Sequence, residues 1–566
     1  MKRIPLKLLI VSLLPIFCAC QKGNNDNKTE ESTESEESTI YEKDEEGFYI
    51  LEDDYFSYSE NPNDKLLKNE VYIPNSISDV PHYNQLRMYI GDKLVPIYTV
   101  KTNMSQVWTP DASNRMSNSY ATFGLKGKVT VKLQANFNYL NIFSIHPLSR
   151  GVNYIVDANR RVAIFEISDI GQYTIEMRSG RTLHLFVEDI DVMTNNDSNV
   201  MYFEPGVHNS QNDSRISNNR INLTSGNKVF IAPGAFIYAK FIANNASNIS
   251  ITGPGYIDGS IFERNADNGT VLVPIEFNYC SNIKLKDFAC VDPAGWTFNM
   301  YFCNGVTIDN VKVISSRSNG DGISLQSCQN VDVSNSFIRT WDDSLVVKNY
   351  PKWSNRNEEG TTKNIHFNDC ILWTDLAQSM EIGYETVGQV MEDITFDNIT
   401  VLHNYHKAVI SIHNGNNANI KNVKFQNITI EDASIGKGDG SKHLIDLRNL
   451  YSTTWSSQHK VTSLGSIDGV DINNVKVLSG IENPEVLIEG CIDSRSEYSK
   501  DPHYVDNVTI TDFELYGSVL DNTYPKLTTN SYVRNLNFVS SGNPVNGASY
   551  LKPDTSGYGN NITFIN

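Results

Sequence analysis

The chain has 566 residues, of which 40% are hydrophobic and 20% are charged, and its formal net charge is −19. This length exceeds what one ordinary hydrophobic core supports, so the sequence predicts two domains. The acidic balance and the lack of a basic patch argue against nucleic acid as a partner, and an acidic polymer would be repelled from such a surface.

The first residues have the pattern of an export signal. Basic residues at positions 2, 3 and 7 precede the apolar run Leu8–Phe17, which is too short to span a bilayer. The sequence then reads Ala19-Cys20, and a small residue followed by Cys resembles a bacterial lipoprotein processing site. We expect residues 1–19 to be a lipoprotein-type signal peptide and Cys20 to carry a lipid anchor in a membrane. The protein would then be exported, as an outer-membrane, cell-surface or periplasmic lipoprotein; a plain secretory signal is the alternative.

Residues 20–46 are predicted to be a disordered acidic tether. Ten acidic residues and three lysines fall between positions 21 and 46, among Ser, Thr and Asn, for a net charge of −7. Like charges and few apolar groups prevent such a segment from burying a core.

Residues 47–200 show short alternating strands separated by turn residues, which is typical of a β-sandwich. Examples are 128–134, 162–167, 173–177 and 183–187. This region contains no catalytic constellation.

From residue 201 to 566 we predict a right-handed parallel β-helix, so that the fold class is all-β. A unit of Asn or Asp followed by Ile or Val recurs, mostly every 22 to 34 residues. It includes Asn248-Ile249, Asn282-Ile283, Asn330-Val331, Asn364-Ile365, Asp393-Ile394, Asn422-Val423 and Asn507-Val508. Such a period, rich in β-branched residues, indicates a solenoid, and the apolar spacing of two excludes helical repeats. Asparagines at the corners tolerate left-handed backbone and can bond to one another along the axis.

Three aspartates fall in two short segments, Asn319-Gly320-Asp321-Gly322 and Trp341-Asp342-Asp343. The offset from Asp321 to Asp342 is 342 − 321 = 21 residues, about one coil, so these side chains should stack roughly 4.7–4.9 Å apart. The alternative is that these aspartates only form turns, since Asp-Gly is an ordinary turn signal. Clustered carboxylates are what inverting sugar hydrolysis requires: one acid for the leaving oxygen and a base to hold water.

The order of these motifs, after Gly253-Pro-Gly-Tyr-Ile-Asp-Gly259, resembles the β-helical glycoside hydrolases of the polygalacturonase and dextranase clan. The Gly-His-Gly and Arg-Ile-Lys elements of polygalacturonases are missing, and Ser379-Met-Glu-Ile-Gly-Tyr384 stands instead. The chain therefore looks most like glycoside hydrolase family 49, the dextranases and isopullulanases, which also carry an N-terminal β-sandwich. The resemblance implies that Asp342 is the general acid and that Asp321 and Asp343 activate water.

Substrate contacts are predicted for side chains near the aspartates or on later coils. They are Trp341, Lys348, Glu381, Tyr384, His403, His406 and Lys407. Trp296 and Trp373 are further candidates for stacking on sugars, although core packing is an equal alternative. Glu385 and His413 fall on the same later coils. His403 and His406 lack a third ligand at convincing spacing, so neither a metal nor any other cofactor is predicted.

The cysteines outside the leader also lack paired CxxC spacing, so zinc binding through them is not expected. They are Cys280, Cys290, Cys303, Cys328, Cys370 and Cys491. A buried ladder of small residues is the preferred interpretation, and one or two disulfides are the alternative in an exported protein.

The sequence thus predicts an inverting, endo-acting glycosidase, acting as a monomer on a polysaccharide such as the α-glucan dextran. A polygalacturonase-like hydrolase is the close rival, although a polyanionic substrate favours basic subsites. A calcium-dependent polysaccharide lyase would need a basic proton abstractor, for which Lys348 is the nearby candidate. A non-catalytic glycan binder is the remaining class, because this solenoid supports many activities.

Overall fold

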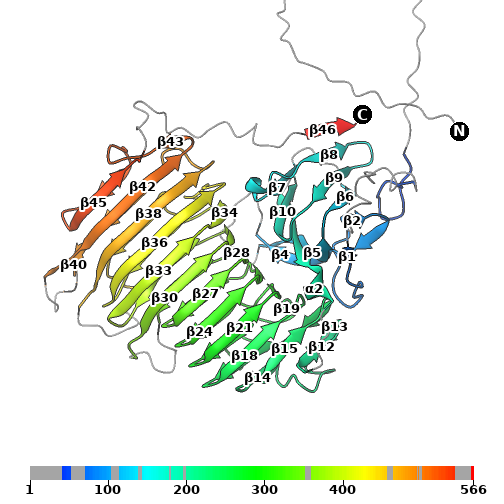
Figure 1. The fold of residues 1–566 in the computed structure, drawn as a ribbon, viewed down its shortest axis with the longest axis horizontal. Coiled ribbons are helices and arrows are strands. Elements are labelled where there is room, and N and C mark those ends of the chain that lie inside the picture. The colour runs from blue at the N-terminus through cyan, green and yellow to red at the C-terminus, as the bar shows by residue number, and fades with distance from the viewer. Residues whose placement is uncertain are drawn as a thin grey trace, which may run out of the picture. The chain divides into compact units, whose positions relative to one another are not determined.

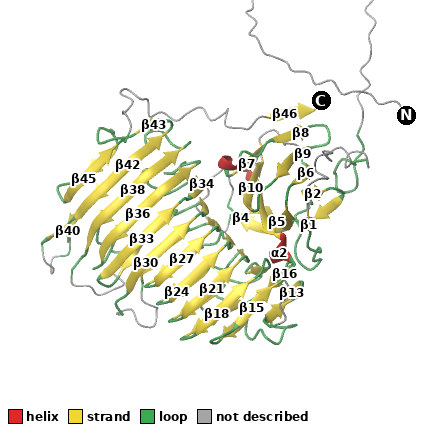
Figure 2. Cartoon of the chain, viewed as in Figure 1, coloured by secondary structure: helices red, strands yellow, loops and turns green. Residues whose placement is uncertain are grey.

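The computed structural model describes residues 41–52, 70–103, 114–137, 143–177, 180–194, 199–350, 358–454, 463–493, 495, 500–541 and 562–565. The predicted signal peptide, Cys20 and most of the predicted tether lie outside these residues. Nearly all regular elements of the described chain are β-strands, as Figures 1 and 2 show. No helix among the described residues is long and apolar enough to cross a membrane.

The described residues before the β-helix, together with β46 near the C-terminus, form two six-stranded sheets. The first has the order β1-β5-β11-β10-β7, with β4 also on β5; the second has the order β3-β2-β6-β9-β8-β46. The first sheet contains β1 (Glu70–Tyr72), β4 (Tyr98–Thr102), β5 (Met116–Lys126), β7 (Phe143–His146), β10 (Gly171–Met177) and β11 (Arg181–Asp189). The second contains β2 (Leu86–Ile90), β3 (Lys93–Val95), β6 (Val129–Ala135), β8 (Tyr154–Asp157), β9 (Val162–Ile167) and β46 (Ile562–Ile565).

Apolar side chains of both sheets meet in one core, which makes this part a β-sandwich. Met88 and Leu133 of the second sheet and Phe123, Ile175 and Leu185 of the first are buried together there. The short helices η2 (Leu148–Arg150) and α2 (Ile190–Met193) follow strands of the first sheet.

One strand departs from the predicted boundaries. Residues 562–565, which the sequence analysis assigned to the β-helix, form β46 and pair in parallel with β8, the edge strand of the sandwich. The periodicity of the coils ends before this strand, so no repeat signal marked its return.

From Met201 the chain coils into a parallel β-helix with three faces, and this confirms the predicted all-β class (Figure 1). The first face contains β12 (Met201–Phe203), β15 (Lys228–Ile231), β18 (Ser247–Thr252), β21 (Ser281–Lys286), β24 (Asn304–Asp309), β27 (Gln329–Ser334), β30 (Thr361–Asn368), β33 (Val390–Asp397), β36 (Asn419–Ile430), β38 (Ser466–Val477), β42 (Val505–Leu515) and β45 (Val533–Val539). The second contains β13 (Gly206–His208), β16 (Ala235–Ile237), β19 (Tyr256–Asp258), β22 (Ala289–Val291), β25 (Lys312–Ile314), β28 (Phe337–Thr340), β31 (Ile371–Thr374) and β34 (Thr400–Asn404).

The third face contains β14 (Arg220–Leu223), β17 (Lys240–Asn244), β20 (Ile275–Asn278), β23 (Phe298–Tyr301), β26 (Ile323–Gln326), β29 (Leu345–Asn349), β32 (Met380–Thr386), β35 (Ile410–Asn414), β37 (His443–Asn449), β39 (Glu485–Glu489) and β44 (Leu527–Thr529). In the last coils the strands β36, β38 and β42 extend from the first face into the second. Two short antiparallel additions complete the strands: β43 (Ser518–Val519) on β42, and the pair β40 (Cys491–Ile492) and β41 (Pro502–His503).

The recurring asparagines occupy the corners, as predicted. Asn282, Asn330 and Asn364 have φ values of 52°, 55° and 56°. Each donates its side-chain amide to an asparagine at the corner one coil earlier; the bond from Asn364 to Asn330 is 2.9 Å long. Asparagine suits these corners because its short polar side chain tolerates left-handed backbone and satisfies its neighbour.

The predicted cysteine ladder is present in the turn after the third face. Cys280, Cys303 and Cys328 each stand two residues after paired strand ends, Asn278, Tyr301 and Gln326. The six cysteines after the leader are free thiols, and Cys491 alone among them is not fully buried. The alternative of disulfides among these six is therefore not supported.

The first sheet of the sandwich packs against the second face of the β-helix. Tyr98 and Phe186 of the sandwich share a buried cluster with Phe236, Phe337 and Trp373 of the β-helix. Polar contacts cross the same boundary: Tyr256 donates to Thr122 at 2.8 Å, and Lys312 forms a buried ion pair with Glu188. The sandwich therefore covers the second face.

Candidate active site on the third face

The three predicted aspartates lie in the turn that leads from the second face into the third. Asp321 stands two residues before β26, and Asp343 stands two residues before β29, directly after Asp342. The register pairs Ile323 with Leu345, so Asp321 is level with Asp343 and the coil there is 345 − 323 = 22 residues long. The amide of Gly322 donates to the carbonyl of Asp343 at 2.8 Å, which holds the two turns together. Adjacent rungs of a sheet are about 4.8 Å apart, so the carboxylates gather on one stripe.

Burial distinguishes the three carboxyl groups. Asp321 and Asp343 are only 4% and 8% exposed, whereas Asp342 is more accessible. Burial and the neighbouring Asp342 carboxylate raise the pKa of Asp321 well above its ordinary value. The same two causes raise the pKa of Asp343 to about 7. Asp342, the general acid that the resemblance implies, contributes to both of these shifts, so the three carboxyl groups titrate together and share the retained proton.

Lys348 on β29 is the cation of the cluster. Its Nζ lies 3.2 Å from Oε2 of Glu385, which is buried on β32. Burial alone would lower the pKa of Lys348, but the carboxylates of Glu385, Asp321 and Asp343 raise it above its ordinary value. Lys348 in turn opposes the rise in the pKa of both aspartates. The lysine is therefore charged and reduces the repulsion among the acids.

A second polar chain crosses the next coils of the third face. Glu381 on β32 accepts hydrogen bonds from Ser411 and from Nδ1 of His413, the latter at 2.9 Å, and both lie on β35. Nε2 of His413 lies 3.3 Å from Asp446 on β37, which Arg448 also binds through Nε at 2.5 Å. Burial alone would lower the pKa of His413, but the two flanking carboxylates raise it to about 9.

Tyr384 places an aromatic ring beside this row of polar side chains. Its ring stacks on His413 with 4.2 Å between centroids and 2° between planes. Gly383 makes the arrangement possible: it has φ = 131°, and a Cβ there would lie 2.1 Å from the carbonyl oxygen of His413. Tyr384 is partly exposed, so its outer face is available to a ligand.

Other predicted aromatic contacts differ in accessibility. Trp341 is 3% exposed and Trp373 is fully buried, so the structure does not support either ring as a platform for sugars. Trp296 is partly exposed, and the pairing of Phe298 with Ile323 places it level with Asp321, one coil earlier. Trp296 and Tyr384 are therefore the candidates that remain for stacking.

Three of the predicted polar contacts need correction or qualification. Glu381 is 0% exposed and is held by Ser411 and His413, so it positions its neighbours and does not reach substrate. His406 is buried in the turn before β35, where Nε2 lies 3.0 Å from Asp439. Lys407, in the same turn, is partly exposed and stays on the stripe of the aspartates, two coils on.

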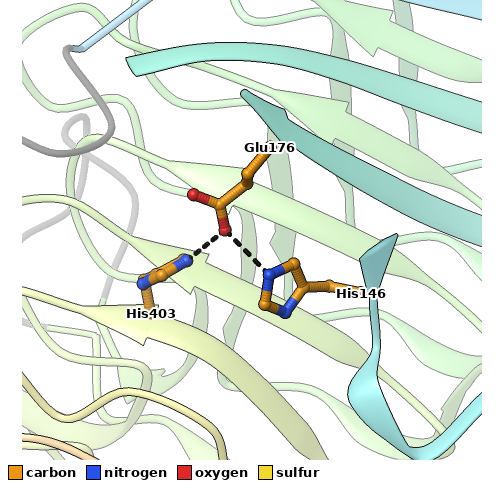
Figure 3. Close-up of side chains that lie close together, drawn as sticks. All are labelled: His146, Glu176 and His403. Carbon is orange, nitrogen blue, oxygen red and sulfur yellow. Dashed lines mark hydrogen bonds and ion pairs between the residues drawn. The ribbon is translucent and has the colours of Figure 1, made fainter. Parts of the chain in front are cut away.

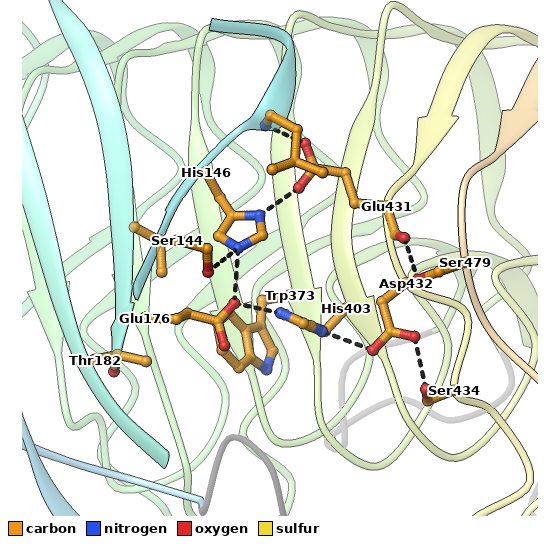
Figure 4. Close-up of polar contacts among 12 residues, drawn as sticks. Ser144, His146, Glu176, Thr182, Trp373, His403, Glu431, Asp432, Ser434 and Ser479 are labelled. Atoms are coloured by element: carbon orange, nitrogen blue, oxygen red, sulfur yellow. Dashed lines mark hydrogen bonds and ion pairs between the residues drawn. The ribbon is translucent and has the colours of Figure 1, made fainter. Parts of the chain in front are cut away.

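His403 is not part of this site. It lies on β34 of the second face, where Nε2 is 2.6 Å from Glu176 of the sandwich and Nδ1 is 2.9 Å from Asp432 (Figure 4). The ring also packs on Trp373, 4.3 Å between centroids. Two-residue alternation cannot tell which face of a coil a strand belongs to, so sequence proximity to His406 was misleading.

The sequence analysis missed Asp446, Arg448 and His443, which complete the polar chain on the third face. Nδ1 of His443 lies 2.8 Å from Asp446. The segment 443–449 reads His-Leu-Ile-Asp-Leu-Arg-Asn, and its Asp-Leu-Arg alternation was an available signal of an outward polar stripe.

Residues 221–477 match the family Glycosyl hydrolases family 28. Over 77 residues the chain is 32% identical to a polygalacturonase from Brassica napus; this segment covers 13% of the chain and 19% of that relative. The match thus spans about a fifth of the relative's length.

The fold is shared with a solved structure, Dex49A from Penicillium minioluteum. The TM-score is 0.54 at 14% sequence identity, over 83% of this chain and 96% of that one. This likeness concerns the fold, including the region before the β-helix. The family model thus matches part of the β-helix, and the solved structure shares the fold of the chain.

Proposed function

We propose that this protein is an inverting glycosidase that cleaves a polysaccharide, with Asp342 as general acid and Asp321 and Asp343 as the pair that activates water. One observation carries the proposal: three aspartates from adjacent coils stand side by side at the edge of the third face. Two of them have a raised pKa, so the cluster retains a proton near neutral pH, as acid–base hydrolysis requires.

The proposed substrate is a neutral α-glucan such as dextran, attacked within the chain. Lys348, the cation beside the aspartates, is already paired with Glu385, and Arg448, three coils on, is paired with Asp446, while Lys407 is partly exposed two coils on. Anionic groups dominate the stripe, and a uronate carboxylate would be repelled unless one of these pairs opened. Trp296 and Tyr384 offer partly exposed rings for uncharged sugar faces.

A galacturonan is the second candidate substrate, because the family 28 match and the Brassica napus relative favour it. The lyase alternative is weaker. An eliminating enzyme needs an uncharged base, whereas its candidate, Lys348, is held in the charged form by three carboxylates.

The first experiment incubates the purified protein with dextran, pullulan and polygalacturonate and measures new reducing ends. Dextran cleavage with a rapid fall in polymer length supports an endo-acting glucanase, and cleavage of polygalacturonate alone would replace that substrate. Proton NMR of the first product anomer tests inversion. Ultraviolet absorbance from an unsaturated product would contradict hydrolysis.

The roles of the aspartates are tested with Asp342→Asn and Asp343→Asn on the polymer that is cleaved and on a glycosyl fluoride of the same sugar. Fluoride needs little protonation to leave, so Asp342→Asn should retain fluoride hydrolysis while losing about 10²–10⁴-fold on polymer. Asp343→Asn should lose both activities. The reverse pattern would exchange the roles, and unchanged polymer cleavage by both variants would refute the proposal.

We also propose that the chain is exported and held at a membrane through a lipid on Cys20. The support is the basic, apolar and Ala19-Cys20 pattern of the first residues. Expression of Cys20→Ser should move the protein from the membrane fraction to the soluble fraction, whereas Cys18→Ser should not. Equal membrane association of both variants would contradict the anchor.

A further inference from the structure

Three ligand-type side chains from distant parts of the sequence converge where the sandwich meets the second face. They are His146 at the end of β7, Glu176 on β10 and His403 on β34 (Figure 3). One atom from each lies within 4.8 Å of the others, and all three residues are largely shielded from solvent. Oε1 of Glu176 lies between the rings, 3.2 Å from Nε2 of His146 and 2.6 Å from Nε2 of His403.

We propose that His146, Glu176 and His403 form a site for one divalent first-row transition-metal ion, with Zn²⁺ as the ion that fits best. Two imidazoles and one carboxylate form a donor set that zinc takes in proteins. Ligands bound tetrahedrally at about 2.0–2.1 Å lie roughly 3.3 Å from one another, so small side-chain rotations suffice to enclose an ion.

The side chains that contact the two histidine ligands give further support for a metal site. Nδ1 of His146 faces Oε2 of Glu431 at 2.6 Å, and Nδ1 of His403 faces Oδ2 of Asp432 at 2.9 Å (Figure 4). Each imidazole is thus oriented by a carboxylate on the nitrogen that points away from the convergence. Zinc-binding histidines usually donate their second ring nitrogen to a carboxylate in this way, which fixes the tautomer.

These orienting carboxylates are themselves fixed. Oε1 of Glu431 accepts from the backbone amide of Leu148 at 2.6 Å, and Oδ1 of Asp432 accepts from Ser434 at 2.6 Å (Figure 4). Ser144 lies 2.9 Å from Nε2 of His146, so its hydroxyl or a water could fill the fourth position of a tetrahedron.

The charge balance also favours a cation. Carboxylates of Glu176, Glu431, Asp432 and Asp375 surround the rings, and the guanidinium of Arg339, 4.0 Å above the ring of Trp373, is the nearby fixed positive charge. Buried negative charge in excess is costly unless it is paired or coordinated. A divalent ion bound by two neutral imidazoles would offset this excess of negative charge, and neither ring would need an additional proton.

The site would serve the architecture and not the cleavage step. Its ligands join two strands of the sandwich to one strand of the β-helix, while the aspartates belong to the third face. The prediction that the chain binds no metal considered His403 with His406, but the partners of His403 come from the sandwich, 227 residues earlier for Glu176.

The test begins with the purified full chain, stripped with EDTA, desalted and titrated with zinc alone. We expect one zinc per chain to remain after a second desalting, by mass spectrometry of the metal. Cobalt(II) should give the visible absorption of a four-coordinate site. His146→Gln and His403→Gln should lose both signals. Asp432→Asn, which alters only orientation, should weaken zinc binding about 10–100-fold.

His366→Gln is the matched control, because His366 is an exposed histidine on β30 whose nearest carboxylate is 3.7 Å away. It should bind zinc and cobalt like the parent chain. The cobalt spectrum of the parent chain keeps the test decisive even if a ligand variant does not fold. No zinc retention and no cobalt band in the parent chain would overturn the proposal. Equal retention by His403→Gln would place any bound zinc elsewhere and also overturn it.

Discussion

Replacing Asp343 by Asn should stabilise the folded protein at alkaline pH, although it removes a proposed catalytic group. Asp343 is 8% exposed and stands beside Asp342, and these two conditions raise its pKa from 3.8 to about 7. The folded state therefore holds a proton that the unfolded state releases at lower pH. The stability from that proton is fully present below pH 3.8 and is lost as the pH rises through 7.

The magnitude follows from the two pKa values. Each unit of pKa difference is worth about 1.4 kcal/mol, so the interval from 3.8 to about 7 means that the ionised Asp343 lowers the free energy of unfolding by about 4 kcal/mol at pH 8. Asn removes that charge and keeps an oxygen for the amide of Gln378, which donates to Asp343 at 3.1 Å. For roughly 500 folded residues the unfolding entropy is about 1 kcal/mol/K, so the melting temperature should rise by about 4 °C.

Thermal unfolding of both proteins at pH 8 and pH 4.5 measures this effect. At pH 4.5 the difference should shrink to about 1 kcal/mol, because the folded-state carboxyl is then protonated and the pH lies only slightly above the unfolded-state pKa of 3.8. Asp332→Asn, at a side chain that is 72% exposed, is the control and should change stability by less than about 0.5 kcal/mol. A variant that melts no higher than the parent at pH 8, or a gain that is unchanged at pH 4.5, would refute the reasoning.

Three further predictions concern the same face. Lys348→Met removes the cation that opposes the rise in pKa of Asp321 and Asp343, so the acidic limb of the pH–activity profile should move to higher pH. Lys348→Arg keeps a positive charge and should leave that limb in place. An unmoved limb in the methionine variant would contradict this role of Lys348. Gly383→Ala places a Cβ against the carbonyl oxygen of His413 and should lower the melting temperature more than Gly91→Ala, which has φ = 60° but open space; equal losses would show that backbone strain alone matters. Glu381→Gln removes one of the carboxylates that hold the pKa of His413 at about 9, so that pKa should fall when the ring is titrated by NMR, and an unchanged value would assign the shift to Asp446 alone.

Much of the architecture was readable from local chemistry. The asparagine corners were predictable because a short amide side chain both permits left-handed backbone and bonds to the next coil, as Asn330 and Asn364 do. The aspartate cluster was predictable because its spacing is close to one coil. The sequence analysis took the 21 residues from Asp321 to Asp342 as about one coil, whereas the observed coil has 22 residues and aligns Asp321 with Asp343.

The solvent exposure of the site residues could not be predicted from the sequence. Trp341 and Glu381 occupy positions near the aspartates, yet one packs inside and the other is enclosed by Ser411 and His413. Burial at such positions depends on side chains from neighbouring coils, and the loops between strands vary in length, so the register cannot be counted from one chain alone.

The sequence by itself determined the repeating coil, its corners and the group of acids, since each depends on residues within one or two turns of the solenoid. Only the tertiary structure decided which face is covered by the sandwich, that His403 meets His146 and Glu176, and that the third face holds the candidate site. The reason is physical: a strand alternates between inside and outside, but what its outside meets is set by packing between segments hundreds of residues apart.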